Sequence, residues 1–139
     1  MQEGKLLLVR EAKEKFYGMW SLPSGHMDHD ENIFDTAIRE TKEETGFDIK
    51  LTGLVAVQNL THRKDNHHYI CFFFAAEIIG GKLSSDANEI ISVEFMEAEK
   101  VLAIDEKQFR GKHKNAIKKF FGGSFLPLDV IENYNMLLQ

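Results

Sequence analysis

The 139-residue sequence contains one cysteine, Cys71, and no excess of positive charge. A single cysteine excludes an internal disulfide and any cysteine-rich zinc site. Cys71 stands in an apolar run, so we expect a buried, unreactive thiol. The net charge of −5 argues against non-specific binding of nucleic acid, which needs a basic surface. No nucleic-acid partner is therefore expected.

The sequence also lacks a long apolar run. No stretch approaches the length of a membrane span, and the residues from Met1 to Gly4 do not resemble a signal peptide. The expected location is cytoplasmic, without a membrane partner.

The composition is that of one soluble domain with a core. Hydrophobic residues make up 43% and charged residues 28% of the chain, and residues 1–139 are expected to form a single α+β unit. Alternation and turn residues predict strands at 5–10, 20–22, 50–60, 67–79 and 90–96, with helices at 32–45, 97–102 and 112–121.

Several local features accompany these elements. We expect residues 11–17 to form a charged loop and residues 61–66 a polar turn. The run from Phe72 to Phe74 predicts a strand buried on both faces, and Gly80-Gly81 is expected to break it. The lysines between residues 112 and 119 predict a basic, solvated helix face, although such a face could also attract phosphate.

A spaced set of charged residues between Gly25 and Phe47 dominates the sequence. The helix at 32–45 presents one apolar stripe, formed by Ile33, Phe34, Ala37, Ile38 and Thr41. Gly46 follows as a C-cap that tolerates a left-handed turn. At about 100° per residue, Glu40, Glu43 and Glu44 share an arc of roughly 100° beside that stripe.

Three carboxylates on one helix face repel each other unless a cation binds between them. Oxygen ligands without cysteine favour a hard metal, Mg²⁺ or Mn²⁺. An EF-hand calcium loop is the competing interpretation, because Asp28, Asp30 and Asn32 alternate. It fails because Ile33 stands where the loop needs Gly and Arg39 where it needs Glu.

The segment from Gly25 to Phe47 resembles the signature of the Nudix superfamily of MutT-like hydrolases. That signature reads Gly-x5-Glu-x7-Arg-Glu-apolar-x-Glu-Glu-x-Gly-apolar, and here only Thr41 replaces an expected apolar residue. Trp20 to Pro23 and residues 89–95 are also similar to family segments. Gly25-His26 and the stretches 117–120 and 126–131 resemble NudJ-type phosphatases more weakly.

The resemblance implies a Nudix fold, a mixed β-sheet sandwiched between helices. Such domains normally have a strand before the one expected at 5–10, so we expect the first strand to be missing from this chain. A missing central strand would leave an unpaired sheet edge, which favours a homodimer.

The resemblance further implies metal-dependent hydrolysis of a nucleoside di- or triphosphate, or a similar X-linked diphosphate, by water attack on phosphorus. The metal ligands would be Glu40, Glu43, Glu44 and the carbonyl of Gly25, with Glu40 a candidate general base. Arg39 would orient Glu40 or Glu43. Two further positions would support the site, Glu31 by closing the loop and Gly46 by ending the helix.

Other candidates for substrate binding are weaker. His26 could contact phosphate or bond within its own loop. Asp86 and Glu89 precede the last strand, where family members often place a substrate contact or a further metal ligand. His62, His67 and His68 could line the substrate mouth or be solvated loop residues. A nucleobase could stack on the ring of Phe16, Tyr17 or Trp20.

Three functional classes remain open at this point. The first is a hydrolase of small nucleotides. The second is an enzyme of the same fold acting on ADP-ribose, a dinucleoside polyphosphate or a thiamin-pathway diphosphate. The third is a non-catalytic nucleotide-binding module, which intact Arg39, Glu40, Glu43 and Glu44 argue against.

Overall fold

The computed structural model describes residues 4–62, 64 and 66–134. The strands are β1 (Lys5–Glu11), β2 (Trp20–Ser21), β3 (Phe47–His62), β4 (His67–Gly81) and β5 (Ile90–Glu97). The helices are α1 (Ile33–Thr45), α2 (Ala98–Ala103) and α3 (His113–Gly122), with short 3₁₀ turns η1 (Glu14–Phe16), η2 (Glu106–Gln108) and η3 (Leu128–Val130). The expected order of strands and helices is confirmed.

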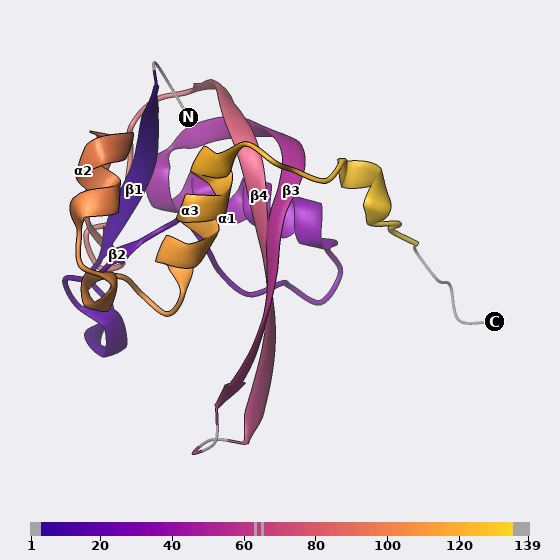
Figure 1. The fold of residues 1–139 in the computed structure, drawn as a ribbon, viewed down its shortest axis with the longest axis horizontal. Coiled ribbons are helices and arrows are strands. Elements are labelled where there is room, and N and C mark those ends of the chain that lie inside the picture. Colours follow the sequence, from indigo (N-terminus) through magenta and orange to yellow (C-terminus); the bar gives the residue numbers. More distant parts are fainter. Residues whose placement is uncertain (1–3, 63, 65, 135–139) are drawn as a thin grey trace.

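The strands form two sheets. One sheet has the order β2-β1-β5 and the other pairs β3 with β4, and all of these pairs are antiparallel. A parallel bridge between Trp20 and Phe109 adds the single parallel element among the described residues. The hairpin of β3 and β4 extends well beyond the rest of the molecule (Figure 1).

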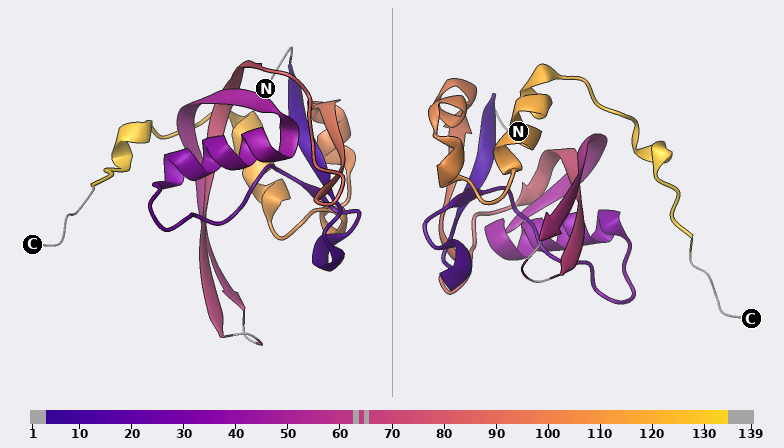
Figure 2. Two further views of the ribbon diagram at one scale, coloured as in Figure 1. Left: turned by 180° about the vertical axis from the view of Figure 1, so that it is seen from behind. Right: turned by 60° about the horizontal axis from the view of Figure 1, so that its bottom comes forward.

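Helices cover both sides of the strands. Figures 1 and 2 show α3 in front of β3 and β4 and α1 behind them. Successive residues of β4 reach the two helices, because side chains alternate along a strand. Phe73 packs edge-on against His113 of α3 at 5.3 Å, whereas Phe74 packs against Phe34 of α1 at 5.4 Å. The predicted α+β arrangement of helices around strands is therefore confirmed.

The main core lies between the first sheet and the helices α2 and α3. Its buried members are Leu6, Leu8, Val101, Phe109 and Ile117. A smaller cluster joins Ala56, Phe73 and Ala116, and Leu22 packs against both. Leu22 thereby anchors the chain immediately before the turn at Pro23, which leads to the loop before α1.

Some predictions on the strands and helices were wrong in detail. Phe72 is 37% exposed, so the triple-phenylalanine run is not buried on both faces. Ile38 is 39% exposed although the helical stripe had placed it inward. Gly80 and Gly81 do not break the strand, because both glycines pair with β3 as the last two residues of β4. Position 11, expected in a loop, is the buried last residue of β1.

The last helix also departs from its predicted character. Lys112 is the N-cap residue and not a helical position. Lys114 is buried, with its ammonium group donating to the carbonyl of Ile104. The basic face of α3 is thus only partly solvated, because one of its lysines bonds the chain that follows α2. Among the described helices, none has the length and hydropathy of a membrane span.

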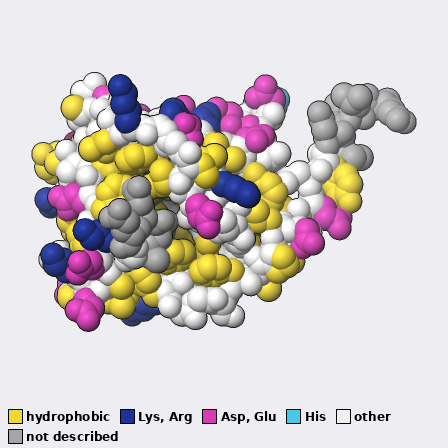
Figure 3. Space-filling view, turned by 90° about the horizontal axis from the view of Figure 1, so that it is seen from above, with side chains coloured by type: hydrophobic (Ala, Val, Ile, Leu, Met, Phe, Trp, Pro, Cys, Tyr) yellow, Lys and Arg dark blue, Asp and Glu magenta, His cyan; other side chains and the backbone are white. Residues whose placement is uncertain are grey.

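The surface mixes charged and hydrophobic side chains. Figure 3 shows hydrophobic groups spread among charged ones across the upper face. On the β3–β4 hairpin, the exposed large hydrophobic residues are Val57, Tyr69, Ile70, Phe72 and Ile79. Cys71 of β4 is half-buried, and burial raises the pKa of its thiol, as expected for an unreactive cysteine.

Candidate active site

The helix α1 has well-defined ends. The Asn32 side chain accepts a hydrogen bond from the Asp35 N–H at 2.9 Å, and the Asp35 carboxylate accepts from the Asn32 N–H. This capping box starts the helix. Gly46 ends it in the left-handed conformation, with φ of 83°, and a Cβ there would clash with the backbone of Lys82 and Ser84. The helix predicted at 32–45 is confirmed, with Asn32 as its cap.

Arg39 holds the loop and the helix together. Its guanidinium bonds Glu31 through Nε and Nη2 at 3.0 and 2.8 Å, and it bonds Glu40 through Nη1 at 2.8 Å. The same Nη1 lies 3.2 Å from Glu43, and Nη2 donates to the carbonyl of His26. A planar guanidinium suits such two-point bonding. These contacts are those expected of a residue that orients Glu40 and Glu43. The hydrogen bond to Glu31 is the main cause that raises the pKa of Arg39 above the usual arginine range.

Glu31 closes the loop onto the helix, as predicted. Its Oε1 accepts from the N–H of Asp28 at 2.9 Å and from the hydroxyl of Thr36 at 2.7 Å. The Arg39 hydrogen bond, followed by the Asp28 N–H, lowers the pKa of Glu31 to about 2. Glu31 therefore stays ionised and is fully engaged by protein groups.

Glu40 packs against the backbone of the loop. A Cβ added at Gly25 would overlap the carboxyl carbon and Oε1 of Glu40, so only glycine permits this approach. The Glu40 side chain is 15% exposed. Burial raises its pKa, against the opposing effect of Arg39. Gly25 and Glu40 thus bring a backbone segment and a half-desolvated carboxylate into direct contact.

Glu44 is the most buried carboxylate of the helix, with 1% of its surface exposed. Its Oε2 accepts from the N–H of Ser24 at 3.0 Å, but Oε1 is buried without a hydrogen-bond partner. Burial raises the pKa of Glu44 to about 8, and the charges of Glu11 and Glu40 add to that effect. An unpartnered buried carboxylate oxygen is unfavourable unless a proton or cation binds it.

Glu43 lies in a different setting. Its side chain is 52% exposed and contacts Arg39 at the helix surface. The three glutamates predicted to share one arc therefore differ in exposure, from buried Glu44 through Glu40 to solvated Glu43.

These groups fit a hard cation in part. Among the described residues, no three His, Cys, Asp or Glu side chains form a ready metal cage. Mg²⁺ rarely needs one, because it keeps waters and shares a few carboxylates with substrate phosphates. The bare Oε1 of Glu44 is a donor of the right chemistry, and Glu40 lies against the Gly25 backbone close by in the fold.

The sequence analysis missed two residues beside this site. Glu11 is fully buried at the end of β1 and bonds Arg110 at 3.1 Å. His113 of α3 accepts from the Leu22 N–H at 3.1 Å, and burial lowers its pKa to about 4, which keeps it neutral. Alternation did not point to Glu11, because the inward pattern of Leu6 and Leu8 leads to Arg10 and the pairing with β5 shifts register between Arg10 and Glu11. Nothing local to α3 pointed to His113.

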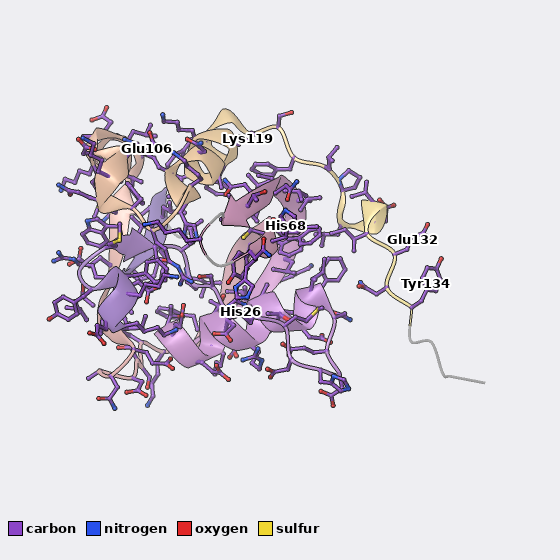
Figure 4. All side chains as sticks on the ribbon, turned by 90° about the horizontal axis from the view of Figure 1, so that it is seen from below. His26, His68, Glu106, Lys119, Glu132 and Tyr134 are labelled. Carbon is purple, nitrogen blue, oxygen red and sulfur yellow. The ribbon has the colours of Figure 1, made fainter. Side chains whose placement is uncertain are left out.

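Among the weaker candidates, His26 lies beside the site, because it follows Gly25 and its carbonyl accepts from Arg39. The His26 ring lies 6.2 Å from the ring of Tyr69, and Tyr69 bonds His67 at 3.3 Å. From below, His26 and His68 lie toward α1 and β4, whereas Lys119 lies on α3 (Figure 4). The side chain of His62 lies outside the described residues.

The two acidic residues before β5 are engaged locally. The Asp86 carboxylate accepts from the Asn88 N–H in its own turn, and the Glu89 carbonyl accepts from the Ala12 N–H. Within the described residues, neither has a bond to the glutamates of α1. Of the aromatic candidates, Trp20 is half-buried beneath Arg10, Phe16 packs under Arg110, and Tyr17 is 70% exposed.

Comparisons with known proteins identify relatives of this chain. The chain is 33% identical over 90 residues to an ADP-ribose pyrophosphatase of Methanocaldococcus jannaschii, covering 63% of this chain and 53% of that protein. It is 39% identical over 83 residues to the 8-oxo-dGDP phosphatase NUDT18 of Danio rerio, covering 60% of this chain and 24% of that protein. The chain thus spans about half or less of these relatives.

Solved structures show the same fold. A NUDIX hydrolase from Nitrosomonas europaea superposes with a TM-score of 0.82 over 96% of this chain and 90% of that one, at 24% identity. An ADP-ribose pyrophosphatase from Streptococcus suis superposes with a TM-score of 0.61 over 87% and 81% of the two chains, at 27% identity. The family model of the NUDIX domain matches residues 1–120, and the chain therefore belongs to the NUDIX domain family.

Proposed function

We propose that this protein hydrolyses a phosphoanhydride bond of a nucleoside di- or triphosphate, or of a related X-linked diphosphate, with Mg²⁺ or Mn²⁺. The observation that carries the proposal is the buried Oε1 of Glu44, which has no partner and lies in the same site as the Gly25–Glu40 contact. A binding module without chemistry would have no need of this unfavourable group.

Each site residue has a proposed role. Glu40, Glu44 and the Gly25 carbonyl would hold the cation, and the solvated Glu43, which bonds Arg39, would contribute least to it. The cation when bound neutralises phosphate oxygens and favours water attack on phosphorus. Glu40 is the candidate general base, because its raised pKa brings it nearer to neutral pH. Arg39 and Glu31 keep the loop in place, and Gly46 ends the helix that carries the glutamates.

The relatives narrow the substrate class. The two named above are an ADP-ribose pyrophosphatase and an 8-oxo-dGDP phosphatase, and both names denote nucleoside diphosphate derivatives. We therefore favour a nucleoside diphosphate derivative as substrate. ADP-ribose falls within this class, dinucleoside polyphosphates are the alternative substrates, and a non-catalytic nucleotide-binding module is the alternative without activity.

His26 and Tyr69 are the best placed residues to contact the nucleoside. His26 follows Gly25 directly, and its ring faces Tyr69, which is 40% exposed. An exposed ring beside the diphosphate site can stack on a base. Asp86 and Glu89 stay predictions, because the hydrogen bonds described for them join them to backbone groups near β5 and residue 12 and do not reach the glutamates of α1.

A nucleotide panel tests the proposal. Purified protein would be incubated with Mg²⁺ or Mn²⁺ and ADP-ribose, 8-oxo-dGDP, nucleoside triphosphates and dinucleoside polyphosphates, with phosphate and nucleotide products resolved. Metal-dependent turnover that is lost in Glu44→Gln supports it. Absence of turnover with every substrate, in protein shown to be folded, favours the binding module.

A homodimer also stays a prediction. The hydrophobic residues exposed on the β3–β4 hairpin, including Ile70 at 64% and Ile79 at 65%, offer a surface for a second copy. Light scattering on the purified chain would measure its oligomeric state, and a monomer at all concentrations would contradict this prediction.

A further inference from the structure

Glu11 is a buried carboxylate that the Nudix signature does not include. It is 0% exposed at the end of β1, fourteen positions before Gly25. Charged side chains are almost never fully buried unless they are paired. The backbone fixes its place: the Glu11 N–H donates to Met19, and the Glu11 carbonyl accepts from Gly18.

Arg110 fixes the side chain of Glu11. Its Nη1 donates to Oε1 at 3.1 Å, its guanidinium stacks 4.3 Å from the centre of the Phe16 ring, and its N–H bonds the Trp20 carbonyl. The carboxylate is therefore held between β1, β2 and the segment before α3.

A structural ion pair explains only half of this arrangement. The second oxygen of Glu11, Oε2, is buried without a partner, as is Oε1 of Glu44. The charge of Glu11 also acts on Glu44, so the two buried carboxylates are close enough to interact. Two neighbouring buried carboxylates that each leave one oxygen bare repel each other, and a cation at the site removes that repulsion.

We propose that Glu11 is a positioning residue of the metal site, held by Arg110 so that its buried negative charge strengthens the binding of a divalent cation at Glu44. The inference rests on the proposed function, because it takes Glu44 as a metal ligand. It adds a residue from outside the signature, and it makes the Glu11–Arg110 pair part of the site as well as of the core.

Mn²⁺ binding without substrate tests this role. Free Mn²⁺ would be followed by electron paramagnetic resonance in titrations of the unmutated protein, Glu11→Gln, Glu11→Asp and the control Glu106→Gln. Glu106 is a matched control because its ion pair with Lys112 is on the surface. We expect Glu11→Gln to bind Mn²⁺ about tenfold more weakly. This loss is at the lower end of the affinity losses typical for residues that support metal ligands. Glu11→Asp keeps the charge but moves the carboxylate, so it should bind Mn²⁺ a few-fold more weakly than the unmutated protein.

The thermal midpoint in EDTA separates a structural role from this one. A lower midpoint in Glu11→Gln with unchanged Mn²⁺ affinity overturns the inference. If Glu11→Gln does not fold, the Glu11→Asp variant provides the test. It should bind Mn²⁺ a few-fold more weakly than the unmutated protein, because its carboxylate is moved, and an affinity equal to that of the unmutated protein overturns the role.

Failure of the proposed function would look different. If the unmutated protein binds no Mn²⁺, or Glu44→Gln binds it equally well, the metal site at Glu44 is wrong and the inference falls with it. Binding that is lost in Glu44→Gln and unchanged in Glu11→Gln overturns only the role of Glu11.

Discussion

Glutamates on the two sides of α1 lie in opposite environments, paired with a guanidinium on the Arg39 side and buried on the Glu44 side. On the Arg39 side, Glu31 and Glu43 bond a guanidinium, and the pKa of Glu31 is lowered to about 2. On the Glu44 side, a carboxylate is buried with one bare oxygen, and its pKa is raised to about 8. The first side is complete within the protein, whereas the second leaves a buried oxygen for which we propose a cation. Five predictions test this difference.

Glu44→Gln should have the largest effect. The substitution removes the negative charge that we propose binds the cation. It keeps the size of the side chain and a carbonyl that can accept from the Ser24 N–H. We expect a loss of about a hundredfold to a thousandfold in kcat/KM, on the scale of losing one electrostatic group from an active site. The measurement is turnover of the best substrate from the panel. Activity within threefold of the unmutated protein would remove the distinction between the two sides.

Gly25→Ala should have the next largest effect. Its methyl group would overlap the Glu40 carboxyl, so either the loop or the glutamate must move. A displacement of about 1 Å in an active site lowers the rate by about a hundredfold. The matched control is Gly122→Ala, because a Cβ there meets nothing within 4 Å. A loss shared by both variants would point to folding and not to the site.

Arg39→Lys should weaken the completed side of α1. Lysine keeps the charge but cannot reproduce the paired bonds to Glu31, Glu40 and His26. We expect about tenfold lower activity, as for other groups that orient a site, together with a lower thermal midpoint. Arg10→Lys is the control, since Arg10 bonds the Gly18 carbonyl and stacks on Trp20 away from α1. Equal losses in both variants would contradict an orienting role.

The two sides should also respond to pH in opposite directions when EDTA is present. Glu31 titrates below its ordinary pKa of 4.5, so its contribution to stability is present above that value and is lost as pH falls toward 2. Glu44 titrates above its ordinary pKa, so its contribution is largest below pH 4.5 and is lost as pH rises toward 8. Thermal midpoints across this range measure both slopes.

Variants identify the source of each slope. Glu44→Gln should abolish the decline in midpoint between pH 4.5 and 8, and Mg²⁺ should reduce that decline in the unmutated protein. A decline that persists unchanged in Glu44→Gln would mean that other groups cause it.

Glu43→Gln should have the smallest effect. The side chain is 52% exposed and its ion pair with Arg39 is at the surface. Such pairs contribute little, so we expect less than about a threefold change in activity. A loss as large as that of Glu44→Gln would show that the exposed glutamate is an essential ligand, contrary to the comparison.

The sequence predicted α1 well because its determinants are local. Asn32, Asp35 and Gly46 define the helix ends by contacts a few residues apart. The Arg39 network is local too, since Glu31 and Glu43 lie within eight positions of it. The resemblance to the Nudix signature, whose residues lie close in sequence, therefore implied these local contacts.

The burial of Glu44 and the position of Glu11 could not be read from spacing. Helical periodicity placed Glu40, Glu43 and Glu44 on one arc, but it did not show that the Ser24 loop would bond Glu44. The bond between Arg110 and Glu11 joins residues 99 positions apart. For the same reason, a strand pattern predicted β4 but not that Phe72 would be exposed on its protruding hairpin.

A crystal soaked in Mn²⁺ and measured for anomalous scattering tests the central claim most directly. The account predicts a Mn²⁺ peak within coordination distance of the Glu44 Oε1 atom, on the side of α1 that the protein leaves incomplete. A peak found only beside Glu43 or the surface of the Arg39 network, with Glu44 still without a partner, would contradict it.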